Sequence, residues 1–386
     1  MTNGVVSRLA ARTLLRYEEL IEPWLAQVLA IEPYAQGLVP VEEVRGGARI
    51  VLGLILRELA DGRPSTELTA HSERMGERRA GQGMPLDSLL AAARLDAKVL
   101  WQGLVAQADP ADLTELLEAA YLVWEAVERH NTGLMTGYQR AVLEMGRQRE
   151  DERRTWFARL LDNDGRNPDV VRDAGRILGF DPEATFVVLA ADRTTTPVPD
   201  PGVVSLRGAA SGLGLRLHLH DSPSGELLVV QVPARGAAPD LVLRAVAGVP
   251  CGVAPPVAGL AAVPHAVRLA AATARLATPE GGPLRLEDAW LDVFARQSPD
   301  LAGELATRVL GPLAALGQSE RERLLETVRT HLAGDGSIAG TAAALYCHRN
   351  TVQHRFGRFK EVTGRDVRAP ADAAVVALAL RAATFL

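Results

Sequence analysis

Residues 337–360 read SIAGTAAALYCHRNTVQHRFGRFK and predict two short helices joined by a tight turn. Ser337 is a favourable N-cap for the first helix. Ile338, Ala342 and Leu345 follow it at the i, i+4, i+7 spacing of a single buried face. The stretch therefore begins with a short amphipathic helix.

The second helix is predicted to begin at Arg349, after the three-residue break at 346–348. Its apolar residues repeat the same spacing, at Val352, Phe356 and Phe359. Between His348 and Lys360 there are four fixed positive charges and no acid. The turn lacks a glycine, and we expect Tyr346 and Cys347 to fill its apolar side.

Two helices of this kind, the second basic and carrying amides, are typical of a helix-turn-helix that docks in the major groove of DNA. Arginine pairs with guanine and Asn or Gln with adenine, while basic residues farther along meet phosphates, and a helix N-terminus itself favours a phosphate. An exposed basic face of an ordinary bundle helix is the alternative. The candidate DNA-binding residues are Ser337, Thr341, His348, Arg349, Asn350, Thr351, Gln353, His354, Arg355, Arg358 and Lys360.

Charge is unevenly distributed along the 386 residues, whose net charge is −5. From residue 321 onward there are ten basic and six acidic residues, a net of +4, so the preceding 320 residues carry −9. A basic C-terminal module on an acidic body suggests an anionic partner for the tail.

Composition is that of a globular protein, with 47% apolar and 23% charged residues. No run of about 18 apolar residues predicts a membrane span, and the N-terminus lacks the order of a signal peptide. Two cysteines cannot build a disulfide framework. We expect a cytoplasmic protein with no membrane partner.

The pattern of elements predicts a multi-domain, mainly α chain with a central α+β domain. Residues 1–150 form a helical bundle, with helices over 49–59, 86–108, 112–129 and 139–161 and a break at Gly133. Residues 165–280 are α+β, with a strand at 185–190, a hairpin of 213–220 and 226–232, and helices at 169–178 and 264–277. Residues 281–386 are helical, with helices at 287–296, 300–309, 320–332, 337–345, 349–363 and 371–384.

The segments 341–345 and 347–352, with their flanks at 324–328, 334–337 and 362–367, resemble the C-terminal helix-turn-helix of PucR/CdaR-type bacterial transcriptional regulators. The resemblance runs from about 310 to 386 and places the helix-turn-helix domain at about 321–386. This sequence departs from the family pattern at Cys347, where the family more usually has an aliphatic residue, and at 354–356, where it more usually has Tyr-Arg-Leu.

The rest of the chain is similar to the same family. The middle, ending at 252–260, resembles the degenerate cyclase-like domain that these regulators often carry. Residues 77–101 resemble the helical N-terminal domain of RsbT co-antagonist proteins. The resemblance implies an N-terminal sensor at 1–150, a catalytically inactive domain at 165–280 and a DNA-binding region at 281–386.

Nucleotide cyclisation is the enzyme hypothesis that a cyclase-like domain raises. It needs carboxylates for two metal ions and a glycine-rich turn for phosphates. The hairpin turn, residues 222–227, reads SPSGEL and keeps one glycine and one acid, and Asp192 has no evident partner. We therefore predict no enzyme, no cofactor and no catalytic residue.

Three smaller clusters leave alternatives open. His218 and His220 lie on one side of a strand, but without a third ligand we expect a surface pair rather than a metal site. The side chains of Trp24, Trp101, Trp124 and His71 either line a ligand pocket or belong to the core. Arg78 and Arg79 form surface ion pairs with acids such as Glu77, or face a cavity and hold an anionic effector.

These observations predict a DNA-binding transcriptional regulator that acts on double-stranded DNA as a homodimer, because one helix in one groove reads only a few base pairs. An effector or protein partner at the N-terminal or middle domain would control it, and the effector site is unknown. The alternative is a signalling protein that acts by switching protein partners.

Overall fold

The computed structural model describes residues 3–193, 208, 214–222, 224–233, 238–278 and 281–385. The chain divides into two compact units, Met1–Asp151 and Glu152–Leu386. Among the described residues, no helix is long and apolar enough to cross a membrane.

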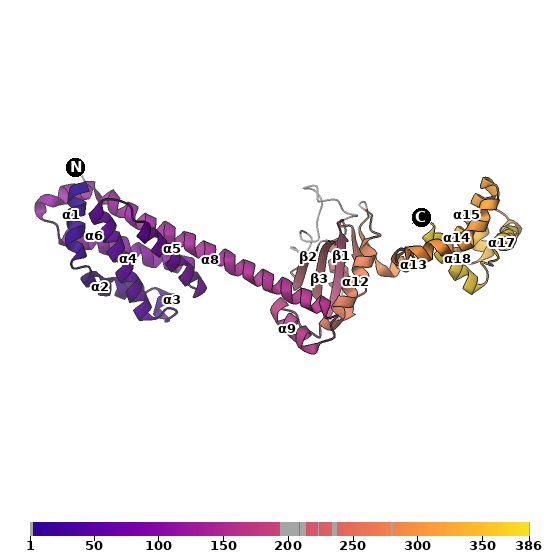
Figure 1. The fold of residues 1–386 in the computed structure, drawn as a ribbon, viewed down its shortest axis with the longest axis horizontal. Coiled ribbons are helices and arrows are strands. Elements are labelled where there is room, and N and C mark those ends of the chain that lie inside the picture. The colour runs from indigo at the N-terminus through magenta and orange to yellow at the C-terminus, as the bar shows by residue number, and fades with distance from the viewer. Residues whose placement is uncertain are drawn as a thin grey trace. The chain divides into compact units, whose positions relative to one another are not determined.

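The N-terminal unit is a helical bundle, as predicted (Figure 1). Its helices are α1 (Asn3–Leu14), α2 (Glu18–Val28), α3 (Glu32–Ala35), α4 (Val41–Asp61), α5 (Thr66–Gly81), α6 (Leu86–Ala106), α7 (Leu113–Glu118) and the first part of α8 (Ala120–Asp162). A short 3-10 turn, Pro110–Asp112, precedes α7. The apolar faces of these helices meet in one core cluster that includes Leu9, Leu52, Ile55 and Leu100.

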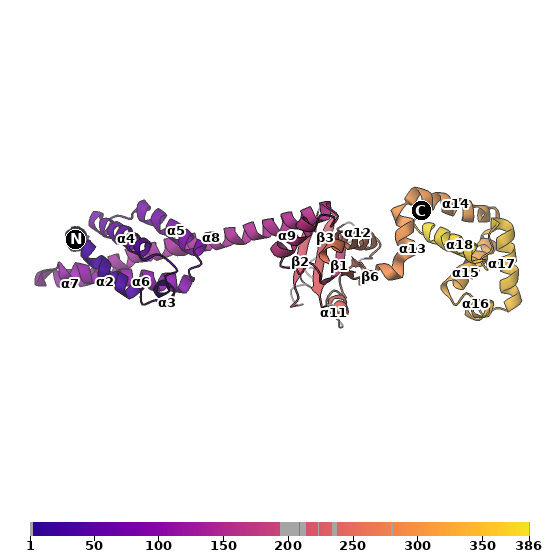
Figure 2. The same ribbon diagram turned by 90° about the horizontal axis from the view of Figure 1, so that it is seen from below.

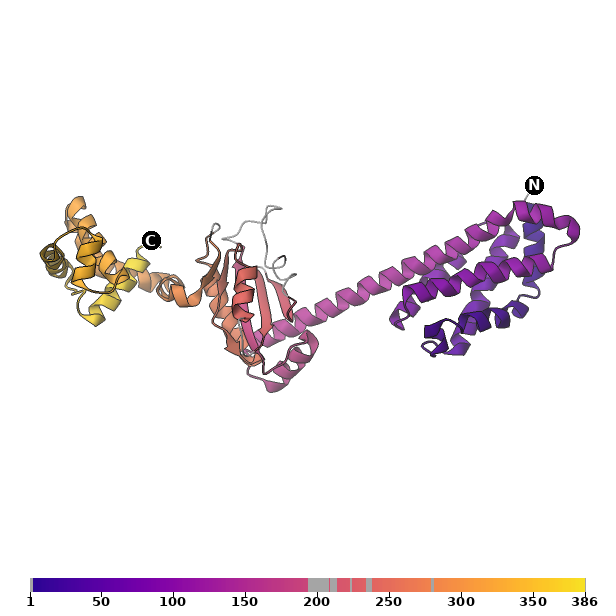
Figure 3. The same ribbon diagram turned by 180° about the vertical axis from the view of Figure 1, so that it is seen from behind.

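Helix α8 is one continuous helix of 43 residues (Figure 3), so the predicted break at Gly133 is wrong. Gly133 and Gly137 lie inside it because α5 packs closely against that face. A Cβ on Gly137 would lie 1.9 Å from the carbonyl oxygen of Glu73, and a Cβ on Gly133 would lie 2.7 Å from Cβ of Ser72. These glycines allow close helix packing rather than a turn.

The middle region is built on a sheet in the order β2-β3-β1-β4-β6, with β5 paired to β1. Its strands are β1 (Thr185–Asp192), β2 (Leu217–Ser222), β3 (Gly225–Val232), β4 (Cys251–Val253), β5 (Val257–Ala258) and β6 (Pro283–Arg285), antiparallel except for the β4–β6 pair. One face packs on the end of α8, α9 (Pro168–Leu178) and α12 (Val263–Ala274), and the other on α11 (Ala238–Ala245) (Figure 2). A 3-10 turn, Leu260–Ala262, leads into α12. The α+β prediction is confirmed.

The predicted hairpin is β2–β3, with Ser222 opposite Gly225. Its first strand begins at Leu217 rather than at Leu213, which lies outside the described residues, as does Pro223 in the turn. Gly225 has φ +154°, and a Cβ there would lie 1.8 Å from the carbonyl oxygen of Ala191. The glycine that remains in the turn is thus required by strand packing.

His218 and His220 share one side of β2, since both rings contact Phe157 of α8 at centroid distances of 4.7 and 5.0 Å. His218 is buried, so the expected surface pair is wrong. Burial lowers the pKa of His218 to about 3, which keeps it neutral at physiological pH. Among the described residues, no group of three or more His, Cys, Asp or Glu side chains is arranged to hold a metal ion.

The C-terminal region is helical and contains α13 (Leu286–Gln297), α14 (Pro299–Leu310), α15 (Gln318–Ala333), α16 (Ile338–Ala344), α17 (Arg349–Thr363) and α18 (Pro370–Ala382). A 3-10 segment, Gly311–Ala315, links α14 to α15. Leu324, Val328, Val352, Phe356 and Val376 belong to one apolar core beneath α16 and α17.

Candidate nucleic-acid interface

The first helix of the predicted pair is α16, labelled in Figure 2. It is capped by Ser337, as the sequence indicates. The Ser337 hydroxyl accepts a hydrogen bond from the backbone N–H of Gly340 at 2.8 Å. It also donates to Asp335, whose carboxylate accepts the Ser337 N–H at 2.9 Å. These hydrogen bonds lower the pKa of Asp335. A carboxylate therefore occupies the start of α16, so we assign Ser337 to capping rather than to a phosphate contact.

The turn between the helices closes α16 by a two-bond C-cap. The N–H of Cys347 donates to the carbonyl of Ala342 at 3.0 Å, and the N–H of Tyr346 donates to that of Ala343 at 3.2 Å. This is the Schellman pattern, which needs a left-handed residue and usually takes glycine. Tyr346 occupies that position with φ +50°.

Tyr346 is 97% exposed, so the expectation that it fills the apolar side of the turn is wrong. Cys347 alone packs against the C-terminal core. A non-glycine residue in the left-handed region carries a cost of about 1–2 kcal/mol. An exposed aromatic in a strained position at the start of the second helix is a candidate contact residue that sequence spacing did not identify.

Helix α17 begins with His348 as its N-cap, because His348 Nδ1 accepts the N–H of Asn350 at 3.2 Å. The predicted apolar residues Val352, Phe356 and Phe359 are all buried. The ring of Phe356 packs edge-on against His331 of α15 at 4.7 Å between centroids. These contacts fix which side of α17 faces outward.

The outward side of α17 carries five of the predicted residues, all of them exposed: Arg349, Asn350, Thr351, Gln353 and His354. Among the described residues their side chains form no hydrogen bond or ion pair with one another or with the rest of the chain. Gly357 lies one turn beyond Gln353 and His354, and a Cβ there would meet nothing within 4 Å. The helix thus presents free amide, imidazole and guanidinium groups beside an open position.

The side chains of Thr341 and Arg355 are directed toward α15 rather than outward. Thr341 is 3% exposed, donates to the carbonyl of Ser337 at 2.7 Å and lies 3.0 Å from His331 Nδ1. Arg355 is half-buried and donates to the hydroxyl of Thr327 in α15 at 3.0 Å. Both side chains hold the two helices on α15, so we assign them a packing role.

Arg358 and Lys360 carry charge at the C-terminal half of α17, and both are ion-paired. Arg358 bonds Glu320 of α15 at 2.9 Å and Glu361 at 3.3 Å, which raises its pKa. Lys360 bonds Asp366 at 3.3 Å. All these groups are partly exposed, where such pairs contribute little free energy, so a phosphate can replace the acid as partner.

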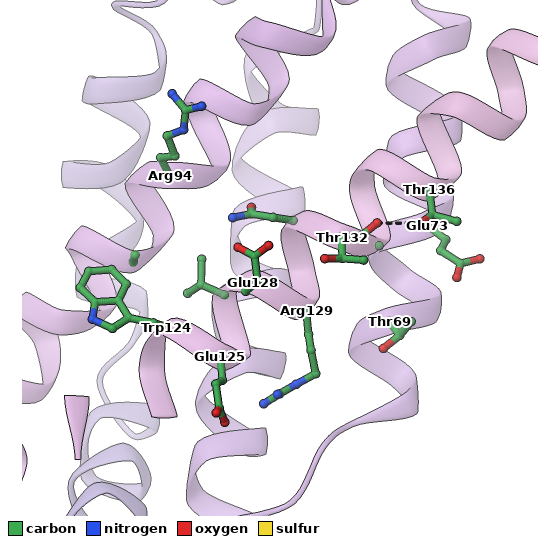
Figure 4. A pocket seen from close by; sticks show the side chains of 13 residues that line it. Thr69, Glu73, Arg94, Trp124, Glu125, Glu128, Arg129, Thr132 and Thr136 are labelled. Carbon is green, nitrogen blue, oxygen red and sulfur yellow. Dashed lines mark hydrogen bonds between the residues drawn. The ribbon is translucent and has the colours of Figure 1, made fainter. Parts of the chain in front are cut away.

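The N-terminal unit has an open groove of about 950 Å³ (Figure 4), lined by α5, α6 and α8. Trp124, 54% exposed, lies at one side of it with Arg94. Glu125, Glu128 and Arg129 line it as well, and Arg129 bonds the buried Glu58 at 2.8 Å. Its mixture of acids and bases favours no charge sign, and we assign it no ligand.

The four aromatic side chains that the sequence suggested as the lining of a ligand pocket do not line one common pocket. Trp24 is buried in the bundle core, Trp101 is partly buried against it, His71 is half-buried, and Trp124 lines the open groove. Arg78 is exposed, whereas Arg79 is buried, so the prediction of surface ion pairs is wrong for Arg79.

Comparison with protein families divides the chain into three matched segments. The model of the PucR C-terminal helix-turn-helix domain matches residues 324–382, which contain α16 and α17. The RsbT co-antagonist protein rsbRD N-terminal domain matches 18–153, and a GGDEF-like domain matches 163–276. The chain has the domain composition of a PucR/CdaR-type bacterial transcriptional regulator. The resemblance predicted from the sequence is confirmed.

Curated relatives of this chain match only in part. The transcriptional activator PmfR of Paenarthrobacter nicotinovorans is 42% identical over 82 residues, 21% of this chain and 17% of the relative. An uncharacterised protein of Mycobacterium tuberculosis is 40% identical over 75 residues, 19% of this chain and 17% of its own length. The chain thus aligns with less than a fifth of either relative.

A solved structure, the regulator of polyketide synthase expression from Bifidobacterium adolescentis, is 26% identical to this chain. The match covers 60% of this chain and 92% of that one, with a TM-score of 0.31.

Proposed function

We propose that this chain is a sequence-specific DNA-binding transcriptional regulator whose helix α17 reads bases in the major groove. The observation that carries the proposal is the row of exposed, unpaired side chains at the N-terminal half of α17, led by Arg349, Asn350 and Gln353. The N-terminal residues of a recognition helix are those that meet base edges. Arginine suits guanine and the two amides suit adenine.

The same proposal assigns Arg358, Lys360 and His348 to the DNA backbone. Arg358 and Lys360 would exchange an acidic partner for a phosphate, and His348 Nε2 faces outward from the N-cap, because Nδ1 is used by Asn350. Thr351 and His354 complete the contact surface beside the base-reading residues. Backbone contacts orient a protein on DNA without selecting sequence.

We further propose that the regulator acts as a homodimer. Helix α8 exposes Tyr121, Trp124, Met135 and Val142, four of the seven a and d positions of a seven-residue repeat between 121 and 142, where Glu128 and the half-buried Tyr138 occupy two others. Asn131 occupies another d position. An exposed stripe of this kind is typical of a helix that pairs with a second copy. A Val142→Glu variant is expected to sediment as a monomer, whereas a dimeric variant would contradict the use of this stripe.

Three domains, 1–150, 165–280 and 281–386, form the proposed cytoplasmic regulator, with an effector or protein partner acting on the first two. The turn at 222–227 keeps one glycine and one acid, which supports a middle domain without cyclase activity. The rsbRD-type N-terminal domain favours partner switching as a second candidate function, in which the N-terminal unit acts through protein contacts.

The experiment that tests the proposal compares binding to the DNA upstream of the chain's own gene with binding to scrambled DNA, at two salt concentrations. Preference for the upstream fragment that persists at higher salt supports base reading. Equal, salt-sensitive binding to both fragments would indicate phosphate contacts alone.

A further inference from the structure

A small cavity lies between helices of the N-terminal bundle, apart from the open groove. Its volume is about 30 Å³, room for roughly two water molecules or one small ion. Apolar side chains form most of its wall, and the polar residues that line it are Trp24, Tyr34, Arg79, Asp96 and His130. All five of these polar residues are buried.

Arg79 of α5 is only partly satisfied within the described residues. Its Nη1 donates to Glu43 and, at 2.7 Å, to Gln82. Its Nε–H is buried without an acceptor, although the Tyr34 hydroxyl of the same cavity wall lies near the guanidinium and interacts with it. A buried donor left without a partner carries a cost of about 1–3 kcal/mol. Such a donor at the wall of a cavity points to an acceptor that enters from outside the chain.

The space beside the guanidinium is kept open by a glycine. A Cβ on Gly47 of α4 would lie 4.0 Å from Arg79 Nη2 and 3.2 Å from Met75 Cε. Because Nη1 already bonds Glu43 and Gln82, the opposite edge, formed by Nε and Nη2, is the one beside this space. Two parallel N–H groups on one guanidinium edge match the two oxygens of a carboxylate.

We propose that this cavity binds a small planar oxyanion, a carboxylate of one or two carbons, on the Nε–Nη2 edge of Arg79. The cavity volume suits a ligand of this size. The apolar wall would cover the ligand, and the guanidinium would pair both oxygens. The site is distinct from the DNA-binding surface.

The local charges favour an anion there. Glu43 balances one positive charge, and Arg78 supplies a second close to it. Burial alone would raise the pKa of Glu43, but hydrogen bonds from Arg79 and Gln82 outweigh it and lower that pKa. Burial raises the pKa of Asp96 to about 8, so its carboxyl group is neutral at pH 7 and does not repel the ligand.

The cavity is lined by residues of α8 as well as α5, namely His130 and Leu134. If the proposed regulatory function holds, a ligand here would act on the helix that extends to Asp162. This consequence rests on the proposed function, whereas binding itself does not.

The test titrates the full chain, without DNA, with sodium formate against sodium chloride at constant ionic strength. Saturable binding is read as a rise in Tm and as a change in tryptophan fluorescence that a Trp24→Phe variant loses. The Arg79→Met variant should bind formate at least about tenfold more weakly. The matched control is Arg74→Met, which changes an exposed arginine of the same helix that does not line the cavity and should bind as the wild type does.

Gly47→Ala provides a second variant that keeps the arginine and suits a helix. Its methyl group would enter the space beside Nη2, and formate binding should weaken severalfold. Equal responses to formate and chloride in the wild type would overturn the proposal. Unchanged formate binding in Arg79→Met would also overturn it. If the Arg79→Met variant does not fold, unchanged formate binding in Gly47→Ala would overturn it instead. Since no DNA is present, these outcomes are independent of the proposed DNA-binding function.

Discussion

His130 Nε2 lies 3.4 Å from Asp96 Oδ2 in the interior of the N-terminal bundle, and the burial of both groups decides which of the two carries the proton between them. The Ser72 hydroxyl donates to the carbonyl of Leu68 at 2.7 Å, so it accepts from His130 Nδ1, also at 2.7 Å. Trp24 Nε1–H donates to Asp96 Oδ1 at 2.7 Å. Nδ1 therefore carries a proton whether the pair is neutral or ionised, and the burial of both groups assigns the second proton to Asp96, with Nε2 as its acceptor.

Burial supports this assignment from both sides. It raises the pKa of Asp96 to about 8 and lowers the pKa of His130 to about 3. A carboxyl group with a raised pKa stabilises the fold fully below its unfolded pKa of 3.8, and this contribution is lost as the pH rises through 8. Neutral His130 acts oppositely, since its contribution is present above 6.5 and is lost as the pH falls toward 3.

The Asp96→Asn variant tests this arrangement. The asparagine can accept from Trp24 and donate to His130, so both hydrogen bonds persist without a titrating proton. The wild type should lose roughly 1.4 kcal/mol of unfolding free energy relative to the variant for each pH unit between about 5 and 7. Urea unfolding at several pH values measures the difference. A variant less stable by about 3–5 kcal/mol at every pH would instead indicate a buried ion pair.

Replacing side chains at the two ends of α17 should affect DNA binding differently. Asn350→Ala removes an exposed amide and should relax preference at one base position, at a cost of about 1–3 kcal/mol on the preferred sequence. Lys360→Ala should weaken binding to all sequences alike and reduce the salt slope by about one. Fluorescence anisotropy with matched and mutated duplexes distinguishes the two effects. An identical loss on every duplex for both variants would count against base reading by α17.

Tyr346 has a strained backbone conformation and an exposed ring in the turn between α16 and α17. Because its φ is +50°, Tyr346→Gly should stabilise the C-terminal region by about 0.5–1 kcal/mol, the relief of backbone strain less the added freedom of the unfolded chain. If the exposed ring contacts the DNA backbone, the same variant should bind DNA more weakly. Tyr346→Phe is the control, since it keeps the strain and removes only the hydroxyl. Thermal unfolding without DNA measures the first effect, and a destabilised Tyr346→Gly variant would show that the turn does not need a left-handed residue.

Close packing of α5 on α8 predicts a large effect at Gly137. An added methyl group would lie 1.9 Å from the Glu73 carbonyl, so Gly137→Ala should destabilise the N-terminal bundle by about 1–3 kcal/mol through forced helix separation. Gly146→Ala, on the same helix with nothing within 4 Å, should be neutral or stabilising by up to about 1 kcal/mol. Denaturant midpoints compare the two. Equal midpoints would show that α5 is not packed this closely.

Sequence spacing predicted the helix pair at 337–363 because its apolar residues recur at i, i+4 and i+7 and its caps are local. It placed Thr341 and Arg355 on the DNA side, whereas both lie at the margin of the buried face and find partners on α15. Those partners are distant in the sequence, so spacing within one helix could not reveal them.

Contacts between residues distant in the sequence also explain what the sequence could not predict in the N-terminal bundle. Gly133 indicated a helix break because glycine disfavours helices locally, whereas tertiary packing requires it there. The cavity polar residues Trp24, Asp96 and His130 come from three helices, and no local pattern relates them. The sequence left open whether an arginine at 78 or 79 forms surface ion pairs or faces a cavity, and Arg79 lines one.

Sequence-specific recognition by α17 is tested most directly by selecting bound duplexes from a random DNA pool with the wild-type chain and with Asn350→Ala. The wild type should enrich a motif with two related half-sites, and the variant should lose preference at one position in each half-site. Selection of no motif by the wild type, or of the same motif at the same strength by both proteins, would contradict the assignment of α17 as the base-reading helix.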